Sequence, residues 1–314
     1  MVQSLDGRGP YMLRLEMSSR CGLSCPFCFQ SQLPMERGDM DLDMAIRVID
    51  QYASDVPNGD VTLHSTGEPL LNPVAFDVIE YIATKGLGVR LTSSGQPIDS
   101  PEKIAFLAEN VKVLNLSIEG VDKRSYEASR AGAQFEHIIW VLEQLRGKIE
   151  QGSALDLGIY TLINTNRSEM DISRRIVSFY ERYECYTKRI QFRALGNQGS
   201  NSNMTYADSV HGLDRCRCLS PFQFLQVRWN GKVSYCCAEV TGDGDIGDAQ
   251  YDRLERLWHS PRIEAIRLQF ENDAYDELPR KCQTCSSSFA KTGQFESRAR
   301  EVIDTYLMKR RSRL

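Results

Sequence analysis

Residues 21–28 read CGLSCPFC and place three thiols, those of Cys21, Cys25 and Cys28, within eight residues. This loop directly follows the first β-type run of the chain, residues 11–17. Three thiolates hold only three corners of a four-iron cluster, which normally takes four cysteines, so one iron would stay open to a ligand that is not protein. A zinc site and a set of buried free thiols are the alternatives. Zinc would want a fourth nearby Cys or His, and the nearest His in the sequence is His64.

Around this loop the chain repeats a β-strand followed by a helix. Six strands are predicted, at residues 11–17, 60–64, 88–92, 112–117, 156–163 and 189–193. The helical stretch 41–53 carries its apolar residues on one face, and Asp41 is placed to cap its start. Six parallel strands with helical crossovers can form a doubly wound sheet or a partial (β/α) barrel. In both folds the active-site residues lie at the carboxyl ends of the strands.

The composition is that of an ordinary globular protein. The 314 residues are 41% hydrophobic and 25% charged, and 38 Lys and Arg against 42 Asp and Glu leave a formal net charge of -4. This balance argues against a nucleic-acid partner, and no apolar run approaches the roughly 20 residues that a membrane helix needs. The first residues lack the features of a signal peptide. We therefore expect a cytoplasmic protein with no membrane or nucleic-acid partner, whose ten cysteines serve metal or redox chemistry.

A polar stretch predicts that the chain leaves the repeating domain, with residues 198–215 as a linker. A second module is expected over residues 216–290, followed by a C-terminal helix over residues 291–314. Within the module, two β-type runs flank Asn230 and Gly231, a pair typical of a two-residue type I′ hairpin turn.

The cysteine loop, in its place after the first strand, resembles the radical S-adenosylmethionine (SAM) superfamily. Members of that family share Cys-x3-Cys-x2-Cys with an aromatic residue, here Phe27, before the last cysteine. The resemblance implies an α/β fold in which residues 1–197 form a partial (β/α)6 TIM barrel. It also implies that the open iron of a 4Fe-4S cluster chelates SAM, and that one electron cleaves SAM to methionine and a deoxyadenosyl radical. That radical takes a hydrogen atom from the substrate.

Segments after the later strands resemble the SAM-binding motifs of this family. Thr66-Gly67-Glu68-Pro69 follows the second strand and is similar to the motif that receives the SAM amino group, since a carboxylate suits an ammonium. A simple turn before Pro69 is the alternative. The other implied SAM contacts are Phe27 near the adenine, Ser94, Ser117 and Glu119 after strands three and four, and Arg130 for the SAM carboxylate. For Phe27 the alternative is core packing, and for Arg130 it is a solvated position on a helix.

Four thiols in the second module can encircle another metal group: those of Cys218, Cys236, Cys282 and Cys285. From the residues alone, a structural zinc ribbon is an equal alternative. The pattern of Cys-x12-Gly-x4-Cys, a gap and Cys-x2-Cys resembles the C-terminal extension called SPASM or twitch, which carries auxiliary iron-sulfur clusters. The later cysteines of the full SPASM pattern are missing, which favours the twitch type with one auxiliary 4Fe-4S cluster. Cys216 is an alternative first ligand, although the spacing to Gly231 favours Cys218.

A cluster with four protein ligands has no open iron and suits electron transfer. The preferred reaction is therefore oxidation of a secondary alcohol in a sugar or aminocyclitol substrate, as in antibiotic biosynthesis, with an electron passed to the auxiliary cluster. Arg193, at the end of strand six, is the candidate for stabilising or deprotonating the hydroxyl, because twitch-type aminocyclitol dehydrogenases use a similar arginine; a surface or salt-bridged arginine is the alternative. His64 is a second candidate base, with a satisfied core histidine as its alternative.

Two other reactions stay open. A thiol that returns a hydrogen atom to the opposite face of the substrate would make the enzyme an epimerase, with Cys237 or Cys216 as the donor; a small buried residue is the alternative for Cys237. Modification of a peptide or protein side chain is the third possibility, and a zinc-stabilised binding module is the non-enzyme alternative. A flavodoxin or ferredoxin-type protein is the expected reductant. Cys185, at the end of an amphipathic helix, is expected in the core.

Overall fold

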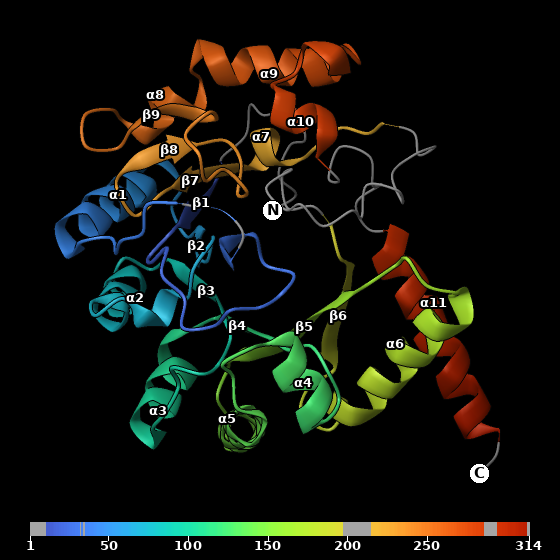
Figure 1. Ribbon diagram of the computed structural model, residues 1–314. Coiled ribbons are helices and arrows are strands. Elements are labelled where there is room, and N and C mark those ends of the chain that lie inside the picture. The colour runs from blue at the N-terminus through green and yellow to red at the C-terminus, as the bar shows by residue number, and fades with distance from the viewer. Residues whose placement is uncertain (1–10, 32, 34, 197–214, 286–293, 313–314) are drawn as a thin grey trace.

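A computed structural model describes residues 11–31, 33, 35–196, 215–285 and 294–312, and its centre is one continuous sheet (Figure 1). The six predicted strands are β1 (Met12–Leu15), β2 (Asp60–Leu63), β3 (Gly88–Ser93), β4 (Val113–Ser117), β5 (Asp156–Ile163) and β6 (Arg189–Ala194). They are parallel and lie in the order β6-β5-β4-β3-β2-β1. A doubly wound sheet reverses its strand order, so this consecutive order excludes it and confirms the open, partial TIM barrel.

Helices cover the outer face of the barrel strands (Figure 1). The connecting helices are α1 (Leu42–Asp55), α2 (Ala75–Thr84), α3 (Pro101–Asn110), α4 (Lys123–Ser129), α5 (Phe135–Glu150) and α6 (Glu169–Tyr183). Helix α1 starts as predicted, because the Asp41 carboxylate accepts a hydrogen bond from the Met44 N–H at 2.8 Å. Alternate strand residues such as Leu13 and Leu15 are fully buried in the core with these helices. The residues between them therefore face the inside of the barrel.

The second module extends the same sheet. It contains β7 (Phe224–Val227), β8 (Lys232–Ser234) and β9 (Asp245–Asp248), with helices α7 (Ser220–Gln223), α8 (Leu254–Trp258), α9 (Pro261–Glu271) and α10 (Arg280–Thr284). Strand β7 pairs in parallel with β1, and β8 and β9 follow in antiparallel pairing. The barrel and the module thus share the edge formed by β1 and β7.

The hairpin between β7 and β8 forms as expected, but the prediction of a type I′ turn is wrong. That turn needs a positive φ at both Asn230 and Gly231, and in the described part of the chain Asn230 is not among the non-glycine residues with positive φ. Gly231 has a φ of 82°, and its N–H donates to the Arg228 carbonyl at 2.9 Å. The loop is therefore one residue longer than predicted. Its extra residue is Trp229, whose N–H donates to the Glu16 carboxylate of the barrel at 3.3 Å.

A long C-terminal helix, α11 (Gln294–Arg311), lies beside α6 and β6 (Figure 1). The Tyr306 hydroxyl donates to Glu181 of α6 at 2.6 Å, and two ion pairs, Arg298–Glu169 and Arg310–Glu184, also join α11 to the α6 region. The prediction that Cys185 lies in the core is wrong: it is exposed, because α6 ends at Tyr183, which takes the buried position. Most of the expected linker (198–214) and the stretch 286–293 lie outside the described residues. Over the described ranges, no helix combines the length and the apolar character needed to cross a bilayer.

Candidate functional site

The three-thiol loop lies beyond the carboxyl end of β1, where the strand rule placed it. Cys25 is buried, Cys21 and Cys28 are partly buried, and none of the three is in a disulfide. Cys25 interacts electrostatically with both other thiols, and burial raises its pKa to about 11 against the opposing effect of Arg130. The loop turns tightly, since the Cys28 N–H donates to the Cys25 carbonyl at 3.0 Å. Three neighbouring thiols, with no fourth cysteine or histidine in residues 21–28, fit the donor set of a four-iron cluster with one open iron.

Two buried amides hold this loop, and neither was singled out from the sequence. The Gln30 side-chain amide donates to the carbonyl of Ser19 at 3.0 Å and to that of Thr66. The Asn72 amide donates to two backbone carbonyls in the segments that flank the loop, at 2.7 and 2.8 Å. Both side chains are at most 5% exposed. An amide in a turn region is ordinary in a sequence, so only the fold shows that these two fix the start of the cysteine loop.

The Gly67-Glu68-Pro69 segment is tightly packed on the same loop. A Cβ at Gly67 would lie 2.2 Å from the Ser18 carbonyl oxygen, so the close approach requires glycine. The Glu68 carboxylate is buried and accepts hydrogen bonds from the Ser94 N–H at 2.7 Å and the Ser94 hydroxyl at 2.6 Å. Pro69 begins a short 3-10 turn that Glu68 caps. The structure therefore brings Gly67, Glu68, Pro69 and Ser94 together beside the thiols.

A buried ion pair lies on another side of the thiols. The Arg130 guanidinium donates to the Glu119 carboxylate, and Arg130 is only 9% exposed, so it is not a solvated helix residue. The guanidinium lies 6.0 Å from the centre of the Phe27 ring, and both charged groups interact with the Cys25 thiol. Ser117 ends β4. Five of the residues expected to contact SAM or its cluster thus share this end of the barrel.

The candidate catalytic residues lie on the inner face of the barrel. The Arg193 guanidinium lies 4.9 Å from the centre of the Tyr160 ring and 3.3 Å from the Glu296 carboxylate, so it is salt-bridged as well as inward-facing. Burial, together with the positive charges of Arg14 and Arg193, lowers the pKa of His64 to about 3. His64 is therefore neutral at physiological pH and is a weaker proton acceptor than an ordinary histidine.

Cys237 lies where the module meets the barrel. Its thiol lies near Arg14 of β1, which neither the spacing nor the composition of the sequence indicated. Interaction with the adjacent Cys236 and the positive charge of Arg14 hold the pKa of Cys237 below its usual range. Cys237 is half-buried. The charge of Arg14 also lowers the pKa of His64 on the inner face.

The four cysteines expected to hold an auxiliary cluster line one pocket of the module. The lining comprises Cys218, Cys236, Cys282 and Cys285 with Ser220, Pro221, Tyr235, Ala238, Glu239, Phe270 and Lys281. Cys216 does not line it. Burial raises the pKa of Cys218 to about 12 and that of Cys282 to about 11. In the described part of the chain, no three His, Cys, Asp or Glu side chains are close enough to ligate a single metal ion. Four thiols around one pocket fit the ligand set of a larger group, a four-iron cluster.

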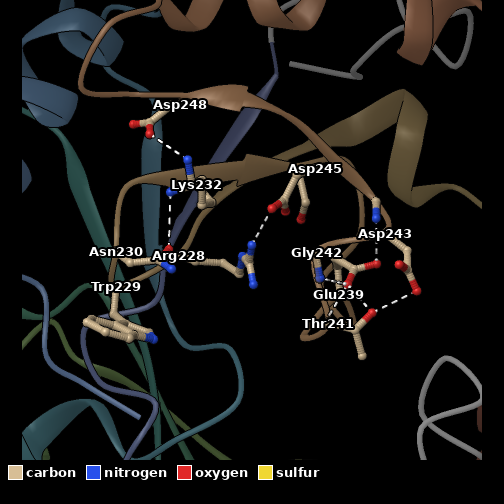
Figure 2. Close-up of polar contacts among 12 residues, drawn as sticks. Arg228, Trp229, Asn230, Lys232, Glu239, Thr241, Gly242, Asp243, Asp245 and Asp248 are labelled. Atoms are coloured by element: carbon tan, nitrogen blue, oxygen red, sulfur yellow. Dashed lines mark hydrogen bonds and ion pairs between the residues drawn. The ribbon is translucent and has the colours of Figure 1, made fainter. Parts of the chain in front are cut away.

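A buried carboxylate fixes one wall of this pocket, and the sequence did not indicate it. Glu239 is 4% exposed and accepts backbone N–H hydrogen bonds from Thr241 at 2.7 Å, Gly242 at 2.7 Å and Gly244 at 2.9 Å. Figure 2 shows its side chain turned into its own loop beside Thr241 and Gly242. The ammonium of Lys281, which directly precedes a pocket cysteine, lies 3.4 Å from the same carboxylate. Glu239 thus joins the two segments that supply the pocket thiols.

Curated proteins of known activity share part of the chain. The tungsten-containing aldehyde ferredoxin oxidoreductase cofactor-modifying protein of Pyrococcus furiosus is 29% identical over 97 residues, which is 31% of this chain and 27% of that protein. The AdoMet-dependent heme synthase of Nitratidesulfovibrio vulgaris is 29% identical over 158 residues, 49% of this chain and 40% of that protein. The PqqA peptide cyclase of Gluconobacter oxydans is 31% identical over 121 residues, 38% of this chain and 33% of that protein. The matched segment is less than half the length of each relative.

Solved structures match nearly the whole fold. BtrN in complex with AdoMet and 2-DOIA has a TM-score of 0.60 at 17% identity, over 88% of this chain and 92% of that chain. Native anSMEcpe with bound AdoMet has a TM-score of 0.65 at 15% identity, over 96% of this chain and 98% of that chain. At these identities the likeness is one of fold.

Two families match the chain directly. Residues 216–286 match SPASM, an iron-sulfur cluster-binding domain, and residues 15–174 match the radical SAM superfamily. The cofactors are accordingly SAM with its 4Fe-4S cluster and auxiliary iron-sulfur binding in the C-terminal module. The second match covers more than half of the sequence, and the protein belongs to the radical SAM superfamily.

Proposed function

We propose that this protein is a radical SAM dehydrogenase that oxidises a secondary alcohol of a small hydroxylated substrate, of sugar or aminocyclitol type, to a ketone. The observation that carries the proposal is the pocket with four cysteines. Four thiolates complete the coordination of one cluster and leave it suited to electron transfer. When bound, SAM and its cluster would supply the radical that takes a hydrogen atom from the carbinol carbon. The four pocket cysteines would hold the cluster that supplies an acceptor for the remaining electron.

We assign the ligands and SAM contacts by their position. The SAM-binding cluster would be held by Cys21, Cys25 and Cys28, the auxiliary cluster by Cys218, Cys236, Cys282 and Cys285, and SAM by Phe27, Gly67, Glu68, Pro69, Ser94, Ser117, Glu119 and Arg130. The fixed carboxylate of Glu68 is suited to the amino group of SAM, because a charge-assisted hydrogen bond is strong in a buried site. The buried pair of Glu119 and Arg130 supplies both charges beside the thiols.

The inner face of the barrel would orient the reacting alcohol. Arg193, held over Tyr160, would donate hydrogen bonds to the hydroxyl oxygen. The neutral imidazole of His64 offers an acceptor for the hydroxyl proton, which would then pass to solvent. A flavodoxin or ferredoxin-type protein would supply the electron that starts the reaction, and a reducing compartment such as the cytoplasm would keep the ten cysteines free of disulfides.

The test uses the anaerobic enzyme with its clusters, SAM and dithionite, supplied with polyols deuterated at single carbinol carbons. We expect deuterium in 5′-deoxyadenosine and an equal amount of ketone, trapped with a hydrazine. The matched control is the Cys21, Cys25 and Cys28 to Ala triple variant, which should give neither product. Deuterated deoxyadenosine without ketone would contradict the dehydrogenase proposal.

Epimerisation is the second candidate, because Cys237 lies half-buried against Arg14 between module and barrel. A thiol donor would place solvent deuterium on the product carbon in D2O, and Cys237→Ser would abolish that label. Peptide side-chain modification is the third, and a relative such as the PqqA peptide cyclase gives reason to test it. Deoxyadenosine formed with a peptide and not with polyols would favour it.

A further inference from the structure

Two polar residues lie side by side on the inner face where barrel and module meet. Arg14 of β1 and Gln226 of β7 are register partners in a parallel pair. Their neighbours along both strands are fully buried on the opposite, outer face: Leu13, Leu15, Leu225 and Val227. Since side chains alternate along a strand, Arg14 and Gln226 both face the barrel interior.

These two side chains carry unused hydrogen-bonding capacity. In the described residues, the Arg14 Nε and both polar atoms of the Gln226 amide are buried without a hydrogen-bond partner. Gln226 has no exposed surface at all. Buried polar atoms of this kind cost free energy unless something binds them. The Arg14 guanidinium stacks 4.6 Å from the centre of the Phe224 ring, which fixes its plane while leaving its edge to receive a ligand.

The positive charge of Arg14 is unbalanced at this position. Arg14 makes no ion pair with any carboxylate of the described residues, and the His64 imidazole on the same face is neutral. Glu16, the next inward residue of β1, is already engaged by the Thr66 hydroxyl and the Trp229 N–H. The Glu296 carboxylate pairs with Arg193 from α11. A group that binds in this space would therefore be favoured if it brought negative charge.

We propose that the substrate carries a carboxylate or phosphate group, and that Arg14 and Gln226 bind this anion on the inner face of the barrel. The Gln226 amide would donate to an anion oxygen, and the Arg14 guanidinium would form charge-assisted hydrogen bonds with it. The positive charge of Arg14 would repel an ammonium group, so the proposed substrate class narrows from sugars and aminocyclitols to acidic or phosphorylated sugars and other polyols. This inference rests on the proposed function, because it assumes that the substrate occupies the barrel interior.

The test is a binding measurement that needs no turnover. The anaerobic enzyme with its clusters oxidised and SAM bound is dialysed against radioactive inorganic phosphate at fixed ionic strength. We expect one saturable site in the wild type. Gluconate, a carboxylate, should displace the phosphate, whereas glucose at the same concentration should not. Displacement by glucose 6-phosphate but not by gluconate would assign a phosphate group; the reverse would assign a carboxylate.

Three variants at the site and one control localise it. Arg14→Gln should weaken phosphate binding about tenfold or more, the size expected for losing a charge-assisted hydrogen bond, and Arg14→Lys should retain part of it. Gln226→Glu places a carboxylate beside Arg14 that would take the place of the anion, so it should abolish binding even if Arg14→Gln fails to fold. Arg174→Gln removes an exposed arginine of α6 and should bind like the wild type.

The inference is overturned if the wild type shows no saturable phosphate site. It is also overturned if Arg14→Lys and Gln226→Glu bind phosphate as the wild type does while their cluster absorption and SAM binding are intact. The proposed function fails separately. An enzyme that binds phosphate through Arg14 but forms no ketone refutes only the dehydrogenase, whereas ketone formation from neutral polyols without an anion site refutes only this inference.

Discussion

The Glu239 carboxylate should decide whether the auxiliary pocket keeps its shape. The perturbation is Glu239→Gln, which preserves size and removes one acceptor. One carboxylate oxygen accepts from the N–H groups of Thr241 and Gly242, and the other accepts from the Gly244 N–H. A glutamine can offer its oxygen to only one side, so its NH2 group must face at least one N–H donor. The orientation in which the NH2 group faces the Gly244 N–H costs the least free energy, because only one N–H then lacks an acceptor.

The magnitude follows from that count. One buried N–H left without an acceptor costs ~1–3 kcal/mol. Loss of the attraction to the Lys281 ammonium, which is partly exposed, adds little. We therefore expect Glu239→Gln to lower the free energy of unfolding by about 2 kcal/mol. At an unfolding entropy of about 2.1 cal/mol/K per residue, this lowers the melting temperature of the 314-residue chain by roughly 3 °C. Glu239→Ala leaves all three N–H groups unpaired and should be less stable still.

The assays are anaerobic thermal unfolding followed by circular dichroism, and iron content per chain. Because Glu239 joins the segments that carry the pocket thiols, its loss should reduce iron at the auxiliary site while the three-cysteine site stays filled. Asp243→Asn is the matched control: it lies in the same loop with a 75% exposed side chain, and should change stability by less than about 0.5 kcal/mol. Glu239→Gln with wild-type stability and full iron content would refute the reasoning.

Three further perturbations test other parts of the molecule. Gly67→Ala forces a Cβ to within 2.2 Å of the Ser18 carbonyl oxygen and should reduce the anaerobic iron content from about eight to about four atoms per chain. Gly22→Ala, which has open space around the new Cβ, should keep both clusters. Equal iron content in the two variants would contradict the close-packing argument. The Tyr235 hydroxyl lies 3.7 Å from the Cys282 sulfur, so Tyr235→Phe removes a hydrogen-bond donor to that ligand. The reduction potential of the auxiliary cluster should become more negative by on the order of tens of millivolts, measured by redox titration with electron paramagnetic resonance. An unchanged potential counts against the hydrogen bond. Because the folded-state pKa of His64 is lowered to about 3 from 6.5, the unfolded state binds more protons below pH 6.5, and stability is lost as the pH falls. Between pH 7 and pH 5 the free energy of unfolding should fall by about 2 kcal/mol more in the wild type than in His64→Gln. Replacement of the exposed His259 by Gln should not reproduce this difference.

The sequence by itself determined the family and the positions of the main cofactor-binding segments. The three-cysteine loop has a fixed short spacing, and so does the Gly67-Glu68-Pro69 segment; both follow strands whose carboxyl ends meet at one edge of a parallel sheet. Local spacing and a repeating strand-helix pattern were therefore enough to predict the partial barrel and the gathering of Cys25, Glu68 and Arg130. The four pocket cysteines were found the same way.

The tertiary structure decided which residues from distant parts of the sequence lie next to each other. The parallel pairing of β7 with β1 brings Gln226 beside Arg14, although 211 positions separate them, and no local pattern encodes that register. The same pairing fixes Trp229 against Glu16 and makes the hairpin loop one residue longer than Asn230-Gly231 predicted. A buried polar residue such as Glu239 or Gln226 looks like a surface residue in the sequence. Its role depends on which donors and charges the fold places around it, because the free energy of a buried polar group is set by its partners.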